Sequence, residues 1–214
     1  PPNEETPLPL RYIPGNHDIG ESQDTPLKQN VPVISDAVRD RYIGHFGPDF
    51  WTLDVPGWRL LALDAQLVGS ELGAAEEQFA FIRSTVLGLA SRRLALFIHK
   101  PLCHLSLAET EVGGRFINPI GRRRLLEALG GVKPALIASG HVHQYVSHTV
   151  DGSHHVWAPS TGFFLPDDIQ PVYGLKQVGY ASHSLHADGT HHSEMVVVPG
   201  LEPLCSSDFP TAYD

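Results

Sequence analysis

Three short stretches of the sequence hold side chains that bind transition metals well, and each follows a predicted buried strand. They are Gly15-Asn16-His17-Asp18, His99-Lys100-Pro101 and Gly140-His141-Val142-His143. Neutral imidazole nitrogens and the oxygen of an asparagine amide bind zinc, manganese or iron, and glycines beside them let the backbone approach an ion closely. A single histidine at a strand end is more often a hydrogen-bonded structural residue. Gly-His-x-His is the stronger signal, because its two imidazoles leave the backbone in the same direction.

The strands that precede these stretches are expected to bring them together. Short apolar runs at 10–13, 94–98 and 135–138 predict the three strands, and loops at the carboxyl ends of strands gather in one crevice of an open α/β sheet. Further strands are predicted at 50–55 and 58–65. Helices are predicted after Ser35, from Ala75 to Leu89, where apolar residues recur every three or four positions, and from Pro119 to Leu129.

The pattern changes in the last third of the chain. Asp151-Gly152 and Asp188-Gly189 are each flanked by β-prone runs, which predicts two antiparallel hairpins within residues 144–200. No internal repeat or break in composition marks a second domain. The sequence therefore predicts one α/β domain over residues 1–214, with a mixed sheet or two packed sheets and a lead-in loop at residues 1–8.

The composition disfavours several classes of function. The chain has 214 residues, with 15 Lys and Arg against 24 Asp and Glu, and a formal net charge of −9. Because its one basic run is Arg122-Arg123-Arg124, we expect no nucleic-acid partner. No apolar run approaches the roughly 18 to 20 residues of a membrane span, so we expect no membrane association and a cytoplasmic location. Cys103 and Cys205 allow at most one disulfide and say little about the redox compartment.

Taken in this order, the three metal-type stretches resemble the last three signature motifs of the calcineurin-like metallophosphoesterases, most closely their cyclic-nucleotide phosphodiesterase-like branch. Leu61-Ala62-Leu63-Asp64 and Ala158-Pro159-Ser160-Thr161 are similar to that branch as well. The similarity covers residues 10 to 165. It implies an α/β fold in which mixed β-sheets pack as a sandwich flanked by helices.

The resemblance also implies a role for each motif residue. The implied metal ligands are Asn16, His99 and His141 for one ion and His143 for the other. The residues assigned to catalysis are His17, as the general acid that protonates the leaving oxygen, and Asp18, which would orient the loop or a ligand. Asp18 could equally be a simple turn or capping residue. The implied cofactors are divalent Mn, Zn or Fe ions, two in the complete family site, which hold a hydroxide and clamp the phosphate oxygens.

Three further residues are candidates for holding the substrate. His104 follows the second metal-type stretch, whereas Arg115 and Asn118 precede the third predicted helix and could grip the phosphate or the organic part of the substrate. Each has a plainer alternative: a loop residue for His104, a solvated charge for Arg115 and a helix cap for Asn118. The histidines in and beside the hairpins are expected to be surface residues rather than a second metal site.

One part of the family pattern falls outside this sequence. In the family, the motifs Asp-x-His and Gly-Asp-x-x-Asp/Asn stand upstream of Gly-Asn-His, and here 14 residues precede Gly15. Those motifs supply the carboxylate that bridges the two ions. We therefore expect the N-terminal strand-helix units to be absent from this chain, and the chain alone to bind one ion or none. The chain may be a fragment, its upstream part may be omitted, another chain may supply it, or the protein may be a truncated relative.

The sequence thus predicts metal-dependent hydrolysis of a phosphoric ester, most simply a small diester such as a cyclic nucleotide or a glycerophosphodiester. The partner is then a small-molecule phosphoester, and assembly into a homo-oligomer is left open. The alternative is a non-catalytic module that binds at most one metal ion and uses the same crevice for a ligand or partner. A nuclease is disfavoured by the acidic charge.

Overall fold

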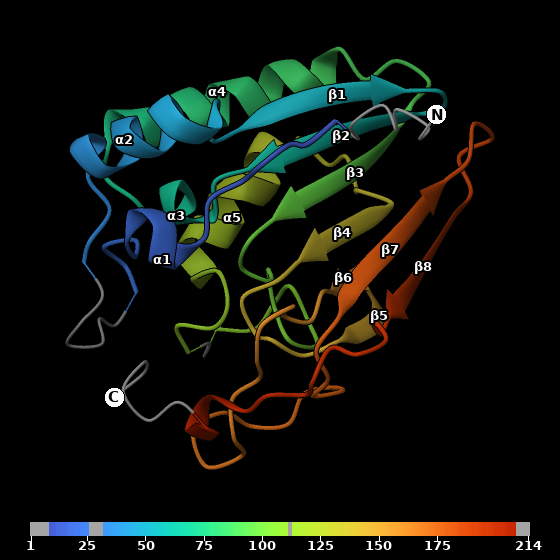
Figure 1. The fold of residues 1–214 in the computed structure, drawn as a ribbon. Coiled ribbons are helices and arrows are strands. Elements are labelled where there is room, and N and C mark those ends of the chain that lie inside the picture. The colour runs from blue at the N-terminus through green and yellow to red at the C-terminus, as the bar shows by residue number, and fades with distance from the viewer. Residues whose placement is uncertain (1–8, 26–31, 111–112, 209–214) are drawn as a thin grey trace, which may run out of the picture.

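The computed structural model describes residues 9–25, 32–110 and 113–208 (Figure 1). The predicted lead-in loop at residues 1–8 lies outside them. The helices are α1 (Asn16–Ile19), α2 (Asp36–Phe46), α3 (Ala65–Val68), α4 (Gly73–Leu87), α5 (Pro119–Ala128) and the short 3₁₀ turn η1 (Ser206–Asp208). The strands are β1 (Trp51–Val55), β2 (Trp58–Leu63), β3 (Arg93–Ile98), β4 (Leu136–Ser139), β5 (Val146–Val150), β6 (Ser153–Trp157), β7 (Tyr180–Leu185) and β8 (His191–Val196).

The strands form one mixed sheet of six and one antiparallel pair. The order in the large sheet is β1-β2-β3-β4-β6-β5, and β7 pairs with β8. The four central strands β2, β3, β4 and β6 run parallel, whereas β1 and β5 pair antiparallel at the two edges. The predicted α/β class with a mixed sheet and a second sheet is confirmed. Because the central strands are parallel, their carboxyl ends open at one edge of the sheet.

The large sheet is covered on both faces, with the helices on one side and β7–β8 on the other (Figure 1). Leu94, Leu96 and Ile98 of β3 belong to the core cluster that includes Phe79 of α4 and Leu125 of α5. The alternate residues of the same strand join a second core cluster, formed by Trp58, Ala95, Leu136, Val156, Phe97, Ala181 and Leu185. This two-sided burial explains why β2 and β3 are apolar almost throughout.

The β7–β8 hairpin is fixed to the large sheet at its turn. Trp58 Nε1 donates a hydrogen bond of 2.8 Å to the His186 carbonyl, and Arg93 Nη1 donates one of 2.9 Å to the Gly189 carbonyl. At Gly57 a Cβ would lie 2.3 Å from the Ala187 carbonyl oxygen, so only glycine fits there. Both predicted Asp-Gly hairpins are present, but they belong to different sheets.

Two local predictions need correction. Leu10–Ile13 is not a strand: Leu10 is 72% exposed, and the segment is held instead by a hydrogen bond from Trp51 Nε1 to the Tyr12 carbonyl. Within residues 9–25, 32–110 and 113–208, no ladder pairing includes residues of this segment. The strand predicted to Ala65 ends earlier, because the Asp64 carboxylate accepts a 2.8 Å hydrogen bond from Gln66 N and begins α3.

None of the helices in the described part of the chain has the length and apolar character that a membrane crossing requires.

Candidate metal centre

Asn16, His99 and His141 meet at the carboxyl edge of the large sheet. Asn16 begins α1, His99 follows β3 and His141 follows β4. His99 Nε2 and His141 Nδ1 lie 3.0 Å and 3.1 Å from Asn16 Oδ1, and the two nitrogens lie 3.1 Å from each other. These three atoms form a nearly equilateral triangle, called the donor triangle below.

The dimensions of the donor triangle suit one face of a metal coordination shell. Ligand atoms that lie about 2.0–2.1 Å from an ion are about 3.3 Å apart in a tetrahedral shell and about 3.0 Å apart in an octahedral one. The measured edges of 3.0 and 3.1 Å fall near both values. The spacing of the three donor atoms is therefore compatible with a zinc, manganese or iron ion.

The hydrogen bonds around the donor triangle favour His141 Nδ1 and Asn16 Oδ1 as acceptor atoms. His141 Nε2 lies 3.4 Å from the Gly114 carbonyl oxygen, to which its N–H can donate, and this leaves a lone pair on Nδ1. Asn16 Nδ2 donates to Glu21 Oε1 at 2.8 Å, which turns Oδ1 toward the histidines. With Nε2 protonated, His141 Nδ1 offers a lone pair 3.1 Å from Asn16 Oδ1, and a cation bound between the two atoms would be attracted to both.

Both histidines of the donor triangle are held in the neutral form. Burial, followed by the charge of Lys100, lowers the pKa of His99 to about 3. Burial, followed by His99 itself, lowers the pKa of His141 well below its ordinary value. Metal binding requires the unprotonated imidazole, so both rings are in the required form at neutral pH.

His143 and His17 lie within electrostatic range of the donor triangle. Both contribute to the lowered pKa of His99. His143 Nδ1 lies 3.0 Å from the Phe163 carbonyl oxygen and can donate to it, which leaves Nε2 as an acceptor in the pattern typical of metal-binding histidines. His17 is exposed on α1.

The backbones of His141 and His143 have φ values of 64° and 57°, a left-handed conformation that costs free energy in non-glycine residues and is often found at functional sites.

Asp18 has a structural partner. Its Oδ2 accepts a 2.7 Å hydrogen bond from the Gly15 N–H, which closes the first turn of α1 directly before Asn16. The side chain is exposed. This is the turn role that the sequence left open, and through it Asp18 orients the loop that presents Asn16 and His17.

Two of the three candidate substrate residues, Arg115 and Asn118, make hydrogen bonds with the backbone. Arg115 follows Gly114, whose carbonyl contacts His141, and its Nη2 donates a 2.6 Å hydrogen bond to the Ile169 carbonyl. Asn118 caps α5, because its Oδ1 accepts a 2.9 Å hydrogen bond from Ile120 N. Arg115 is therefore next in sequence to a residue that contacts the donor triangle, and its part in substrate binding stays a prediction.

His104 packs within an aromatic group rather than against the donor triangle. Its ring centroid lies 4.9 Å from that of Tyr173 and 6.1 Å from those of Phe116 and Trp157. Phe116 and Trp157 are buried. The structure thus gives His104 a packing role, and its contribution to substrate binding stays a prediction.

The sequence did not predict the ion pair behind the donor triangle, formed by Glu21 and Lys100. Lys100 Nζ lies 2.5 Å from Glu21 Oε2, and both residues are buried. The sequence did offer one signal for such a pair: Lys100 directly follows a predicted buried strand, where a lysine needs a partner of opposite charge. Within residues 9–25, 32–110 and 113–208, no group of three His, Cys, Asp or Glu side chains could hold a metal ion. The site therefore has three donors only when the amide oxygen of Asn16 is counted with the two histidines.

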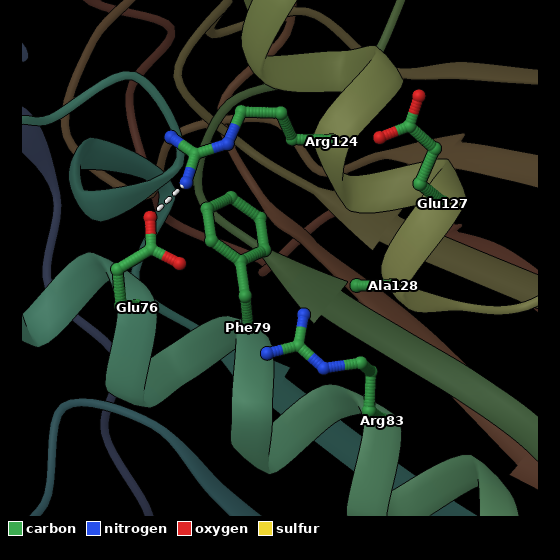
Figure 2. A pocket seen from close by; sticks show the side chains of 6 residues that line it. All are labelled: Glu76, Phe79, Arg83, Arg124, Glu127 and Ala128. Atoms are coloured by element: carbon green, nitrogen blue, oxygen red, sulfur yellow. Dashed lines mark hydrogen bonds and ion pairs between the residues drawn. The ribbon is translucent and has the colours of Figure 1, made fainter.

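The depression between α4 and α5 is a separate feature (Figure 2). It measures about 180 Å³, and its lining residues are Glu76, Phe79, Arg83, Arg124, Glu127 and Ala128. Arg124 covers the Phe79 ring at 4.3 Å and pairs with Glu76. Small-molecule sites usually have volumes of about 300–1,000 Å³, and none of the candidate site residues lines this depression.

The fold and site together define a mixed α/β sandwich with an Asn and two His at the carboxyl edge of its parallel strands. No family model and no curated protein matches this chain. Among solved structures it is similar to GAP50, the anchor in the inner membrane complex of Plasmodium, at 14% identity and a TM-score of 0.48 over 72% of this chain and 50% of that one. It is also similar to a putative 5'-nucleotidase from Staphylococcus aureus in complex with alpha-ketoglutarate, at 13% identity and a TM-score of 0.36 over 68% of this chain.

The chain spans half the length of the first of these neighbours and 28% of the second. Likenesses at this level carry no argument about activity. The functional assignment therefore depends on the geometry of the donor triangle and on the motifs that supply it.

Proposed function

We propose that this chain carries the site of a metal-dependent phosphoric-ester hydrolase, acting most simply on a small diester such as a cyclic nucleotide or a glycerophosphodiester. The observation that supports the proposal is the donor triangle of Asn16, His99 and His141, with His143 in electrostatic range of it. The resemblance of these motifs to those of the calcineurin-like metallophosphoesterases supports the same assignment.

The residues of the chain divide the work of hydrolysis. When bound at the centre, a divalent Zn, Mn or Fe ion supplies Lewis acidity toward phosphoryl oxygens and activates water. Asn16, His99 and His141 hold it through uncharged donors. His17, exposed near the centre, donates a proton to the leaving oxygen. Arg115, next to Gly114, adds a positive charge to hold the phosphate.

A second candidate function follows from the charge of the donor triangle. Its three donors are all uncharged, so the positive charge of a bound ion would remain uncompensated by these ligands. An anionic group, such as a phosphate or a carboxylate, could compensate it without being hydrolysed. This would make the chain a metal-dependent binding module rather than an enzyme.

Hydrolysis of bis-p-nitrophenyl phosphate by the full-length protein with Mn²⁺ or Zn²⁺ distinguishes the two functions. The control for His17→Ala is His192→Ala, because His192 has a 69% exposed side chain on β8, away from the centre. We expect His17→Ala to lower the rate about 10²- to 10⁴-fold with metal binding retained, and His192→Ala to leave it unchanged. Metal binding without hydrolysis by the parent would favour the binding module. Equal rates for His17→Ala and the parent would show that His17 is not the general acid.

A further inference from the structure

A buried ion pair lies directly behind the donor triangle. Lys100 Nζ and Glu21 Oε2 are 2.5 Å apart, with side chains only 2% and 9% exposed. The other carboxylate oxygen, Glu21 Oε1, accepts the 2.8 Å hydrogen bond from Asn16 Nδ2. One carboxylate therefore joins the ammonium group of Lys100 to the amide of Asn16.

Both members of the pair have further contacts that hold them in place. Glu21 N donates to the Pro32 carbonyl at 2.7 Å, and the Glu21 carbonyl accepts from Ile34 N at 2.8 Å. Lys100 directly follows His99, and its Nζ also lies 3.3 Å from Thr25 Oγ1. Glu21 is thus held by two backbone hydrogen bonds and by the ion pair with Lys100, in addition to its contact with Asn16.

Stability alone is a poor explanation for this pair. Burial of two charges costs about as much free energy as their attraction returns, and apolar replacements of buried pairs are often neutral or stabilising. Around metal sites, by contrast, a carboxylate behind a ligand fixes the orientation of that ligand, and its loss weakens metal binding about 10- to 100-fold. The contact between Glu21 and Asn16 has this arrangement.

The orientation of the Asn16 amide decides what the donor triangle can bind. The two ends of an asparagine amide have nearly the same shape, so their partners determine which end faces inward. Because Asn16 Nδ2 donates its hydrogen bond to Glu21, Oδ1 faces His99 and His141. With the amide reversed, Nδ2 would donate to the lone pair of His141 Nδ1 and close the triangle by a hydrogen bond.

We propose that Glu21, held by Lys100, is the positioning residue of the metal centre. It keeps the Asn16 amide in the orientation that presents Oδ1 to a divalent cation. The inference rests on the proposed function in one respect, that the donor triangle binds a metal ion.

Two double variants of the full-length protein separate this role from a structural one. E21Q/K100M and E21L/K100M both remove the two buried charges, but only the first keeps an oxygen that can accept from Asn16 Nδ2. Titration calorimetry with Mn²⁺ and Zn²⁺ should give E21Q/K100M an affinity within about threefold of the parent, and E21L/K100M one about 10- to 100-fold lower. Equal affinities in the two folded variants would overturn the proposal. If E21L/K100M does not fold, E21M/K100M takes its place.

A metal-free measurement keeps the positioning role separate from the metal centre itself. The Asn16 side-chain NH₂ signals, assigned by their loss in Asn16→Ala, should exchange slowly with solvent in the parent and in E21Q/K100M. They should exchange much faster in the variant with an apolar residue at position 21. Unchanged exchange there would overturn the proposal. A parent that binds neither Mn²⁺ nor Zn²⁺ but shows the expected exchange pattern would refute the proposed function and leave the orienting role of Glu21 established.

Discussion

His99 Nε2 lies 3.1 Å from His141 Nδ1, although 42 residues separate the two histidines along the chain. They follow the neighbouring parallel strands β3 and β4, whose register pairs Phe97 with Ala138 near their carboxyl ends. Their rings meet edge to face at 71°, with centroids 4.9 Å apart. Parallel pairing thus converts two weak sequence signals into one site of defined geometry.

Gly15→Ala should weaken metal binding by displacing His99. A Cβ at Gly15 would lie 2.9 Å from Cε1 and 3.0 Å from Nε2 of the His99 ring, so the ring must move. The Gly15 backbone, at φ −99° and ψ 173°, accommodates alanine without strain. We expect the affinity for Mn²⁺ or Zn²⁺ to fall about tenfold or more while the thermal midpoint changes little, as measured by titration calorimetry and thermal unfolding.

Gly140→Ala is the matched control for that variant. Its Cβ would lie 3.9 Å from His99 Nδ1, which is an ordinary contact. We expect an affinity within about twofold of the parent. A similar loss in both variants would show that the packing of glycine against His99 is not what sets the geometry of the centre.

Acid should destabilise the protein between pH 6.5 and 4 through two histidines of the sheets, the buried His155 and the partly exposed His183. Burial lowers the pKa of His155 and of His183 from 6.5 to about 4. The unfolded chain then binds more protons than the folded one in this interval, so the free energy of unfolding is full above pH 6.5 and falls as the pH drops toward 4. The loss reaches up to about 3 kcal/mol for His155, which is 1% exposed, and is smaller for the partly exposed His183.

Urea unfolding at pH 7, 5.5 and 4 measures this loss. His155→Gln should show a shallower decline than the parent, whereas His192→Gln, at an exposed position on β8, should follow the parent. A decline in His155→Gln as steep as in the parent would mean that His155 does not contribute.

Trp58→Phe should loosen the β7–β8 hairpin. The variant loses the hydrogen bond from Trp58 Nε1 to the His186 carbonyl and leaves a small void at a fully buried position, which costs about 1–3 kcal/mol. Amide hydrogen exchange should accelerate in β7 and β8 more than in β2 and β3. Trp51→Phe, which loses a hydrogen bond to Tyr12 near the surface, should leave the hairpin unaffected; equal acceleration in both variants would contradict this role of Trp58.

Local patterns predicted most of the secondary structure. Apolar spacing located α4 and α5, and the Asp-Gly turns located both hairpins, each within a few residues. The patterns could not show that β6 pairs in parallel with β4 while β7 and β8 form a sheet of their own. That difference depends on contacts between distant residues, such as Trp58 with His186, 128 positions apart.

The three donor residues could be found from the sequence, whereas the two residues that support them could not. Asn16, His99 and His141 stand in recognisable local motifs, and the order of the strands brings them together. Glu21 stands in no such motif and Lys100, although it follows His99, carries no metal ligand; their pairing needs the fold to join residues 79 positions apart. The predicted strand at Leu10–Ile13 failed because an apolar run becomes a strand only beside a partner.

The metal content of this chain tests the central claim most directly. The protein is dialysed with Mn²⁺ or Zn²⁺, freed of loosely bound ions and measured by mass spectrometry, together with H99A/H141A and the control H154A/H191A. The control removes another histidine pair, whose His154 Nδ1 and His191 Nε2 lie 3.0 Å apart between β6 and β8. We predict one ion per chain in the parent and in H154A/H191A, and none in H99A/H141A. An ion retained by H99A/H141A, or no ion in the parent, would contradict the account.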